Sequence, residues 1–561
     1  MKYSVKKTPR IYTKLQGFAD LIPVLAARGE RVLFKYPKDK KFVTLSNADF
    51  AAMIQQVAAG LSAAGLAGKR VALIGETSPE WVASYIGVIA GGGVAIPMDK
   101  ELTIEAIEGF LAGVDAEAII YSATFHEKLA NARASHPSLT TFIPLTGEAG
   151  EKILPFADLT AKGKEALEAG YTIPERDHNA PATMLFTSGT TGTSKCVVLA
   201  EKNTCSCVNA ACESVNFSDS DVLLSVLPIH HTYELAIMIA AINLGCTIGI
   251  NDSLRYLMRN IAEIKPTGLI LVPLFVSTIY KRIMDKAKKQ GKDGSIRKWL
   301  PLASHMPRKM RRKIFSAIHV TFGGRLEKII CGGAALNPEL VKFFDAIGIQ
   351  ICEGYGITEC SPLIAVNPYF ANKPGSVGPA VPCCTARIAV TGKNDLGFDE
   401  GEIQAKGDNV MIGYYNNDAA NADAFTEDGW YRTGDMGYMD KKGYIHITGR
   451  LKSVIVLESG KNVFPEEIEE YLENIEEIAE SVVVGRKAED SDAVLLTAVV
   501  YPNKDAFPEG TDKDTMYKAI YDKITEQNKR VASFKKIMAL ELRDEEFEKT
   551  TSKKIKRHLV K

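Results

Sequence analysis

Short apolar runs alternate with longer helical patterns over about the first 380 residues of the chain. Arg70–Gly75 has the composition of a strand, and Ser78 and Pro79 after it are typical of a helix N-cap and first turn. Gly93–Pro97 then completes a β-α-β unit. Similar apolar runs lie at 222–227, 269–272 and 328–331. Because unbroken Val, Ile and Leu runs indicate strands that are covered on both faces, we predict parallel-rich sheets flanked by helices.

Two uncharged stretches, 81–98 and 235–251, approach the length of a transmembrane helix. The first contains three consecutive glycines and Pro97, and the second contains Asn243 and several glycines. Both are more typical of a buried helix that runs into a buried strand. The sequence therefore predicts no membrane span, and no apolar core follows the basic N-terminus to make a secretory signal.

The pattern changes twice in the last third of the chain. Past about residue 373, shorter strands alternate with glycine turns, at 386–391, 401–405 and 443–448. After residue 450 we expect an amphipathic helix at 465–472, strands at 481–484 and 494–501, and a helix from about 514. We predict an α/β protein with a large N-terminal domain that includes a β-rich subdomain, and a small mobile α+β C-terminal domain. The predicted boundaries are 1–449 for the N-terminal domain, 450–452 for a hinge and 453–561 for the C-terminal domain.

Composition narrows the class of protein. A chain of 561 residues is too long for one compact core, so two or more domains are expected. Lys and Arg together number 68, as do Asp and Glu, so no net charge draws the protein to nucleic acid. The ten cysteines have no CxxC pair and no metal-like spacing, which favours a reducing, cytoplasmic environment.

The segment 187–195 reads Thr-Ser-Gly-Thr-Thr-Gly-Thr-Ser-Lys and follows an apolar strand. Glycines let backbone N–H groups approach an anion, hydroxyls donate to phosphate oxygens, and lysine adds a positive charge. A Ser/Thr/Gly surface loop is the simpler alternative, but a lysine after so dense a run favours phosphate. The segment differs from a Walker A loop because Ser194 precedes the lysine and Cys196 follows it. We assign phosphate binding to Thr187, Ser188, Gly189, Thr190, Thr191, Gly192 and Lys195.

Two further segments follow strand-like runs. Tyr355-Gly356-Ile357-Thr358-Glu359 combines an aromatic ring for a base, a hydroxyl for a phosphate and a carboxylate for magnesium. Gly333 and Ala334, after another strand, would let a ring approach closely. Asp435 stands in a turn and suits ribose hydroxyls, and a buried salt bridge or a turn cap is the simpler alternative.

A basic stretch at 281–313 holds thirteen Lys and Arg residues against Asp285 and Asp293. A solvated helix face is the usual explanation of such a run. The alternatives are contact with an anionic membrane surface, an acidic carrier protein, or the phosphates of a nucleotide-tailed thiol.

Taken together, the motifs resemble the ATP-dependent adenylate-forming superfamily of acyl-CoA synthetases, luciferases and adenylation domains. The 187–195 loop, the 355–359 motif, Gly434-Asp435, Gly449-Arg450 and the terminal 549–557 segment occur in the order of that family. The chain departs from it where Ser194-Lys195-Cys196 replaces Pro-Lys-Gly, and where Lys553 replaces a glycine. The hinge stretch 449–462, the segment 465–469 and the segment 227–234 look most like bacterial long-chain fatty-acid–CoA ligases.

The resemblance implies two half-reactions: ATP and Mg²⁺ convert a fatty acid to acyl-AMP, and coenzyme A then takes the acyl group. It implies that Thr358 holds the α-phosphate, that Glu359 binds magnesium, and that Lys554, with Lys553 as the alternative, bridges the acyl carboxylate and the α-phosphate. Lys452 would be the pivot of the mobile domain. Adenine would lie among Tyr355, Gly356, Gly333 and Ala334, ribose on Asp435 and Arg450, and the acyl chain near His230, Tyr233 and Gly333.

Other functions remain open at this point. His230 and His231 would serve equally as core histidines, and two adjacent histidines do not make a metal site. The acceptor is coenzyme A or an acyl-carrier protein, and the fatty acid is expected to be long-chain. A catalytically silent nucleotide- or lipid-binding protein could share the fold. We expect a cytoplasmic protein, with peripheral contact to the inner face of the membrane as one option.

Overall fold

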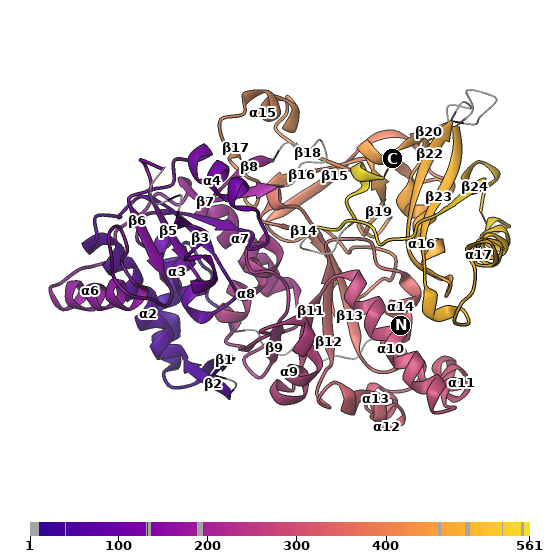
Figure 1. The fold of residues 1–561 in the computed structure, drawn as a ribbon, viewed down its shortest axis with the longest axis horizontal. Coiled ribbons are helices and arrows are strands. Elements are labelled where there is room, and N and C mark those ends of the chain that lie inside the picture. Colours follow the sequence, from indigo (N-terminus) through magenta and orange to yellow (C-terminus); the bar gives the residue numbers. More distant parts are fainter. Residues whose placement is uncertain are drawn as a thin grey trace.

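The computed structural model describes residues 11–39, 41–130, 132, 136–187, 194–457, 462–487, 494–529, 531–550 and 555–560. Two large α/β sheets lie side by side, and a β-rich region and a small yellow C-terminal region follow them (Figure 1). This arrangement confirms the predicted fold class.

The central sheet of the described chain has eight strands in the order β14-β13-β12-β11-β9-β10-β1-β2. Neighbours from β13 to β1 pair in parallel, and the edge pairs β13–β14 and β1–β2 are antiparallel. The strands span β14 Leu363–Val366, β13 Gln350–Gly356, β12 Lys328–Gly332, β11 Gly268–Leu271, β9 Val222–Ser225, β10 Thr247–Ile250, β1 Val32–Lys38 and β2 Lys41–Ser46.

The second sheet has seven strands in the order β17-β8-β7-β4-β3-β5-β6, again within the described residues. It is parallel from β7 to β6 and antiparallel across β7–β8 and β8–β17. The strands span β17 Gly413–Tyr414, β8 Lys195–Ala200, β7 Pro181–Thr187, β4 Val94–Met98, β3 Arg70–Ile74, β5 Ala118–Tyr121 and β6 Thr141–Pro144.

The remaining sheets are smaller. An antiparallel four-stranded sheet forms the β-rich region, with β15 Cys384–Lys393, β16 Asp399–Gly407, β18 Tyr431–Met439 and β19 Ile445–Arg450. The C-terminal region has the pair β20 Ile455–Val456 and β21 Asn462–Val463, and the sheet β22 Ile478–Lys487, β23 Val494–Pro502 and β24 Ala539–Leu542. It packs a core of its own, which includes Ile468, Leu472 and Ile524.

Helices cover the sheets. Those of the N-terminal half are α1 Leu21–Arg28, α2 Asn47–Ala63, α3 Pro79–Ala90, α4 Ile104–Gly113, α6 Phe156–Glu168, α7 Glu201–Ser214, α8 Thr232–Leu244 and α9 Leu257–Ile264. Those that follow are α10 Pro273–Lys289, α11 Asp293–Ala303, α12 Arg308–Ile314, α13 Ser316–Thr321, α14 Pro338–Ala346, α15 Asp418–Ala424, α16 Pro465–Leu472 and α17 Lys513–Asn528.

Helix α3 shows how local sequence fixes an element. Ser78 Oγ accepts the N–H of Trp81 at 3.1 Å, and Pro79 occupies the first turn, as predicted. Trp81 and Tyr85 on this helix are 0% exposed and their rings stack. The stretch 81–98 is thus a buried helix followed by buried strand β4, and 235–251 repeats this arrangement in α8 and β10. None of the helices within the described residues is long and apolar enough to cross a bilayer.

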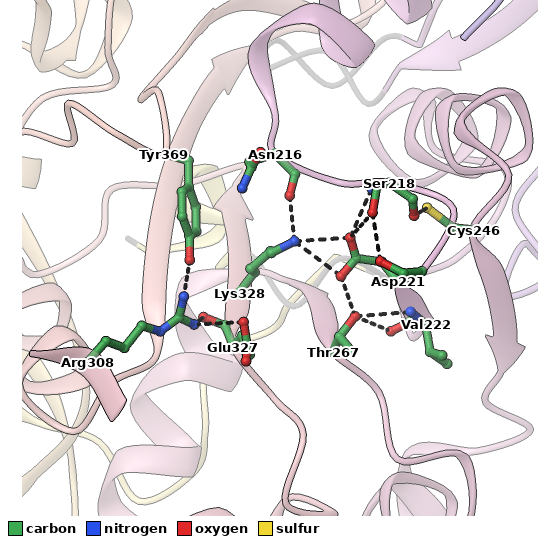
Figure 2. A network of polar contacts seen from close by, with 11 residues as sticks. Asn216, Ser218, Asp221, Val222, Cys246, Thr267, Arg308, Glu327, Lys328 and Tyr369 are labelled. Carbon is green, nitrogen blue, oxygen red and sulfur yellow. Dashed lines mark hydrogen bonds and ion pairs between the residues drawn. The ribbon is translucent and has the colours of Figure 1, made fainter. Parts of the chain in front are cut away.

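An ion-pair network ties together the amino ends of the central strands (Figure 2). Lys328, the first residue of β12, donates to both carboxylate oxygens of Asp221, at 3.1 and 3.0 Å. Asp221 also accepts the Thr267 hydroxyl at 2.7 Å, next to β11. Because these parallel strands start together, their carboxyl ends also meet at one edge, and that opposite edge carries the sequence motifs.

Candidate functional site

One large cleft collects the predicted site residues. It has a volume of about 2970 Å³ and is lined by the carboxyl ends of β12 and β13, by β18 and β19, and by α8, α10 and α16. Segments from the central sheet, the β-rich sheet and the C-terminal region therefore share one cavity. The predicted residues on its wall include Thr187, Lys195, His230, Tyr233, Gly333, Ala334, Tyr355, Gly356, Thr358, Glu359, Asp435, Arg450 and Lys452.

The turn after β12 allows close packing at the floor of the cleft. Gly333 has a φ of +88°, a conformation that favours glycine. A Cβ on Gly332 would lie 3.0 Å from Gly354 O and 3.4 Å from Tyr233 Cζ. Small residues here let Tyr233, near the start of α8, reach across to the strand ends, where its hydroxyl donates to Ile330 O at 3.3 Å.

Tyr355, Asp435 and Arg450 form a chain of polar contacts. Tyr355 Oη donates to Asp435 Oδ2 at 2.7 Å, and Arg450 Nε lies 3.0 Å from Asp435 Oδ1. Asp435 and Arg450 are register partners on β18 and β19, so the antiparallel pairing itself sets their contact. The prediction that Asp435 stands in a turn was wrong, because the residue lies within strand β18, and the buried salt bridge considered as its alternative is present. Burial, together with the Asp435 charge, raises the pKa of Tyr355 well above its usual value. The tyrosine therefore stays protonated as a hydrogen-bond donor to the carboxylate.

Lys195, Tyr414 and Glu359 form a second group. Tyr414 Oη donates to Glu359 Oε1 at 2.9 Å, and Lys195 Nζ lies 4.6 Å from the centroid of the Tyr414 ring. Tyr431 Oη lies 3.3 Å from Tyr414 Oη, and burial raises the pKa of both tyrosines. Lys195 starts β8 opposite Thr187 on β7. One tyrosine thus joins the lysine of the 187–195 loop to the carboxylate of the 355–359 motif.

The histidine pair lies on the cleft wall. The rings of His230 and His231 are 4.1 Å apart, and His230 Nε2 is 3.5 Å from Asp99 Oδ2. Burial, with His231 and Lys100 nearby, holds the pKa of His230 well below its usual value, so the ring is neutral at pH 7. A neutral ring beside Tyr233 is compatible with an apolar ligand.

Two buried carboxyl groups on the cleft wall were not predicted. Glu234 is 2% exposed and accepts the Ser225 hydroxyl, and Glu353 is 6% exposed on β13. Burial raises the pKa of each to about 8. In the sequence, Glu353 follows a strand-like run and Glu234 follows the histidine pair. Neither pattern indicates that the carboxyl group is buried.

Some predicted residues fall outside the described chain. They are Ser188, Gly189, Thr190, Thr191, Gly192, Lys553 and Lys554. Residues on either side of them line the cleft. Thr187 and Ser194 flank the segment 188–193, and Thr550 and Ile555 flank the segment 551–554. Lys452 is exposed in the short turn Leu451–Ser453.

Tyr414 is a further site residue that the sequence interpretation missed. It stands in Gly413-Tyr414-Tyr415, an aromatic pair after a glycine, which was the one available signal. Only the pairing of β17 with β8 carries it to Lys195. Among the described residues, no group of three or more His, Cys, Asp or Glu side chains could hold a metal ion.

Comparison with known proteins places the chain in a family. The AMP-binding enzyme family matches residues 24–415, and the AMP-binding enzyme C-terminal domain matches 452–561. The long-chain-fatty-acid–CoA ligase FadD15 of Mycobacterium bovis is 30% identical over 81% of this chain and 77% of its own. The long-chain-fatty-acid–[acyl-carrier-protein] ligase AEE15 of Arabidopsis thaliana is 27% identical over 88% of this chain and 78% of its own.

Among solved structures, ATP-bound MatB of Rhodopseudomonas palustris superimposes with a TM-score of 0.75 at 25% identity, covering 97% of this chain and 98% of its own. The adenylation domain of a Mycobacterium chelonae carboxylate reductase gives a TM-score of 0.78 at 20% identity, over 96% of this chain and 88% of that one. The predicted resemblance and the predicted acid–thiol ligase class are both confirmed. The chain belongs to the AMP-binding enzyme family.

Proposed function

We propose that this ligase activates a long-chain fatty acid with ATP to give acyl-AMP and pyrophosphate, and then transfers the acyl group to the thiol of coenzyme A. The observation that carries the proposal is that the Tyr355–Asp435–Arg450 and Lys195–Tyr414–Glu359 groups share the wall of one cleft. One group offers a ring and a carboxylate, which suit a nucleoside. The other offers a cation and a second carboxylate, which suit phosphates.

In the first half-reaction the fatty-acid carboxylate attacks the α-phosphate of ATP. Both reactants are anions, so the barrier is dominated by repulsion and by charge that develops on phosphate oxygens. Lys195 and the 188–193 loop would hold the β- and γ-phosphates, and Thr358 the α-phosphate. Asp435 would accept ribose hydroxyls, while Arg450 and Tyr355 fix its orientation.

Magnesium fits this site through Glu359. Tyr414 engages Oε1 of that half-buried carboxylate, and Glu359 lines the cleft next to Thr358. Mg²⁺ commonly takes one or two carboxylates together with substrate phosphates and water, so a single protein carboxylate suffices. When bound, the ion would neutralise part of the phosphate charge.

The second half-reaction needs a different arrangement of the C-terminal region. Lys554 would bridge the carboxylate and the α-phosphate during adenylation, and rotation about Lys452 would then withdraw it and admit the thiol. Gating of this kind lets a single cleft serve two transition states. The thiolate attacks the acyl carbon, and AMP leaves.

The acyl chain would lie between α8 and the β12 turn. His230, Tyr233 and Gly333 line the cleft there, and Leu274 and Met284 on α10 extend the apolar wall. The neutral state of His230 keeps charge away from the chain. The relative FadD15 is named a long-chain-fatty-acid–CoA ligase, which supports a long-chain fatty acid as the substrate.

The test is pyrophosphate release with ATP, magnesium and fatty acids of graded length, with and without coenzyme A. Release that depends on the acid, with acyl-CoA formed on addition of the thiol, is expected. Release without any acyl-CoA, together with acylation of an added carrier protein, would instead establish the reaction named for the Arabidopsis relative. No release with any acid would refute the proposal and leave a nucleotide- or lipid-binding protein.

A further inference from the structure

Helices α11, α12 and α13 carry a concentration of exposed apolar side chains. They follow one another in the chain and lie along the lower right margin of the molecule (Figure 1). Exposed single apolar residues are ordinary, but five within 22 residues are not. The five are Trp299 at 43% exposure, Leu302 at 54%, Met310 at 52%, Ile314 at 39% and Val320 at 73%.

The same helices are basic and almost free of acids. Residues 286–325 contain twelve Lys and Arg, and Asp293 is the one acid among them. Three of the arginines are used by the fold: Arg308 donates to Gly348 O, Arg311 to Asp345, and Arg312 to Gly324 O. These three belong to the internal packing of the α12 region and not to a binding surface.

The other cations of this region face solvent. The exposed ones on or next to the three helices are Lys292, Arg297, Lys298, Lys309, Lys313 and Arg325. Within the part of the chain that the structure describes, none of them forms an ion pair or a side-chain hydrogen bond with a protein group. Together with the five apolar residues, they make up what we call the α11–α13 surface.

We propose that the α11–α13 surface docks the enzyme on an anionic lipid bilayer. Lysine and arginine near such a surface are attracted to the lipid phosphates, while adjacent apolar side chains enter the headgroup boundary. Tryptophan is well suited to that boundary because it joins a large apolar ring to an N–H donor. An acidic protein partner would satisfy the cations but has no evident need for five separate exposed apolar groups.

The surface is continuous with the cleft. Arg297 and Leu300 of α11 line the cleft, as do Leu274 and Met284 of α10. The inference rests here on the proposed function, since a long-chain fatty acid partitions into lipid. Docking through α11–α13 would place the α10–α11 wall of the cleft near the bilayer that holds the substrate.

The test is cosedimentation of the full chain with vesicles of phosphatidylcholine containing phosphatidylglycerol, without ATP or fatty acid. Binding should weaken with added salt and with pure phosphatidylcholine. Each lost cation should lower vesicle affinity about fivefold, so Lys309→Glu/Lys313→Glu should lower it by about 25-fold or more. The matched control is Lys162→Glu/Lys164→Glu on α6, at the opposite end of the molecule (Figure 1), which should bind as the wild type does.

A second readout reports insertion. Trp299 fluorescence should shift to the blue with anionic vesicles, and Trp299→Phe should abolish that shift while Trp81 and Trp430 remain. Equal vesicle binding by both lysine pairs, or no binding by the wild type, would overturn the proposal. Wild-type vesicle binding by Lys309→Glu/Lys313→Glu, with loss only of acyl transfer to an acidic carrier protein, would also overturn it in favour of a protein partner.

The proposed reaction is tested separately. With octanoate, which is soluble without lipid, pyrophosphate release by Lys309→Glu/Lys313→Glu should equal that of the wild type, because neither lysine lines the cleft. Failure of vesicle binding with intact release would refute docking alone. Absence of release with intact vesicle binding would refute the ligase proposal alone.

Discussion

Replacing Tyr414 by phenylalanine removes one hydroxyl group and leaves the ring that faces Lys195. The lost contact is the 2.9 Å hydrogen bond to Glu359 Oε1. Hydrogen bonds to charged groups contribute about 1.5–3 kcal/mol. If Tyr414 orients Glu359 for magnesium, adenylation should slow by about 10- to 150-fold, because ~1.4 kcal/mol corresponds to a factor of ten. Tyr414→Leu also loses the contact with Lys195 at 4.6 Å, which adds roughly 0.5–2 kcal/mol.

The assay has two parts. Fatty-acid-dependent pyrophosphate release is measured at increasing magnesium, and ATP binding is measured by calorimetry with and without magnesium. A positioning role predicts that Tyr414→Phe weakens ATP binding mainly when magnesium is present. A purely structural role would lower the melting temperature and leave that difference unchanged.

Tyr431→Phe is the matched control. Its hydroxyl lies 3.3 Å from that of Tyr414, and the two residues are similarly buried. It should therefore alter the magnesium dependence less than Tyr414→Phe does. Release by Tyr414→Phe within twofold of the wild type, or an equal loss in Tyr431→Phe, would refute the positioning argument.

Four further outcomes are expected. Lys328→Met leaves the Asp221 carboxylate buried without its cation. Denaturant titration should therefore show that the free energy of unfolding falls by about 3–5 kcal/mol. A loss below about 1 kcal/mol would contradict this. Burial raises the pKa of Glu234 from 4.5 to about 8, so the folded chain keeps a proton that the unfolded chain releases, and stability should fall as pH rises between those values. Glu234→Gln should flatten that part of the stability curve, and an unchanged slope would reject the assignment. Lys554→Ala should lose pyrophosphate release yet still convert supplied acyl-adenylate to thioester; equal loss of both would exclude the bridging role. Lys452→Pro should spare adenylation more than thiol transfer, and equal retention of both would exclude the pivot.

Local patterns were sufficient for much of the fold. The Ser78 cap, the buried α3–β4 stretch and the parallel strands β9, β11 and β12 lie where apolar runs and capping residues predicted them. Strand β19 begins at Ile445 and ends at Arg450, two residues later than the predicted 443–448 run, because its end is set by pairing with β18. A helix cap and the repeat of buried positions along an element each involve residues that are close together in the chain. Both can therefore be recognised in the sequence.

The order of the motifs also came from the sequence, since it resembles one family over most of the chain. What the sequence left open was which groups meet. Tyr355 and Asp435 are 80 positions apart, and Tyr414 and Glu359 are 55 apart, yet each pair is joined by a hydrogen bond. Such pairs depend on strand register and on packing between sheets, for which no local signal exists.

The basic stretch 281–313 shows the same division most clearly. Its composition predicted a charged surface, but Arg308, Arg311 and Arg312 turn inward and bind carbonyl and carboxylate groups of neighbouring segments. Lys309 and Lys313, on the same short helix, remain exposed. The sequence by itself determined the elements, their order and the chemistry that each motif can perform. Only the tertiary structure decided which charged side chains bind groups within the protein and which stay exposed to bind ligands. That depends on what each helix face packs against.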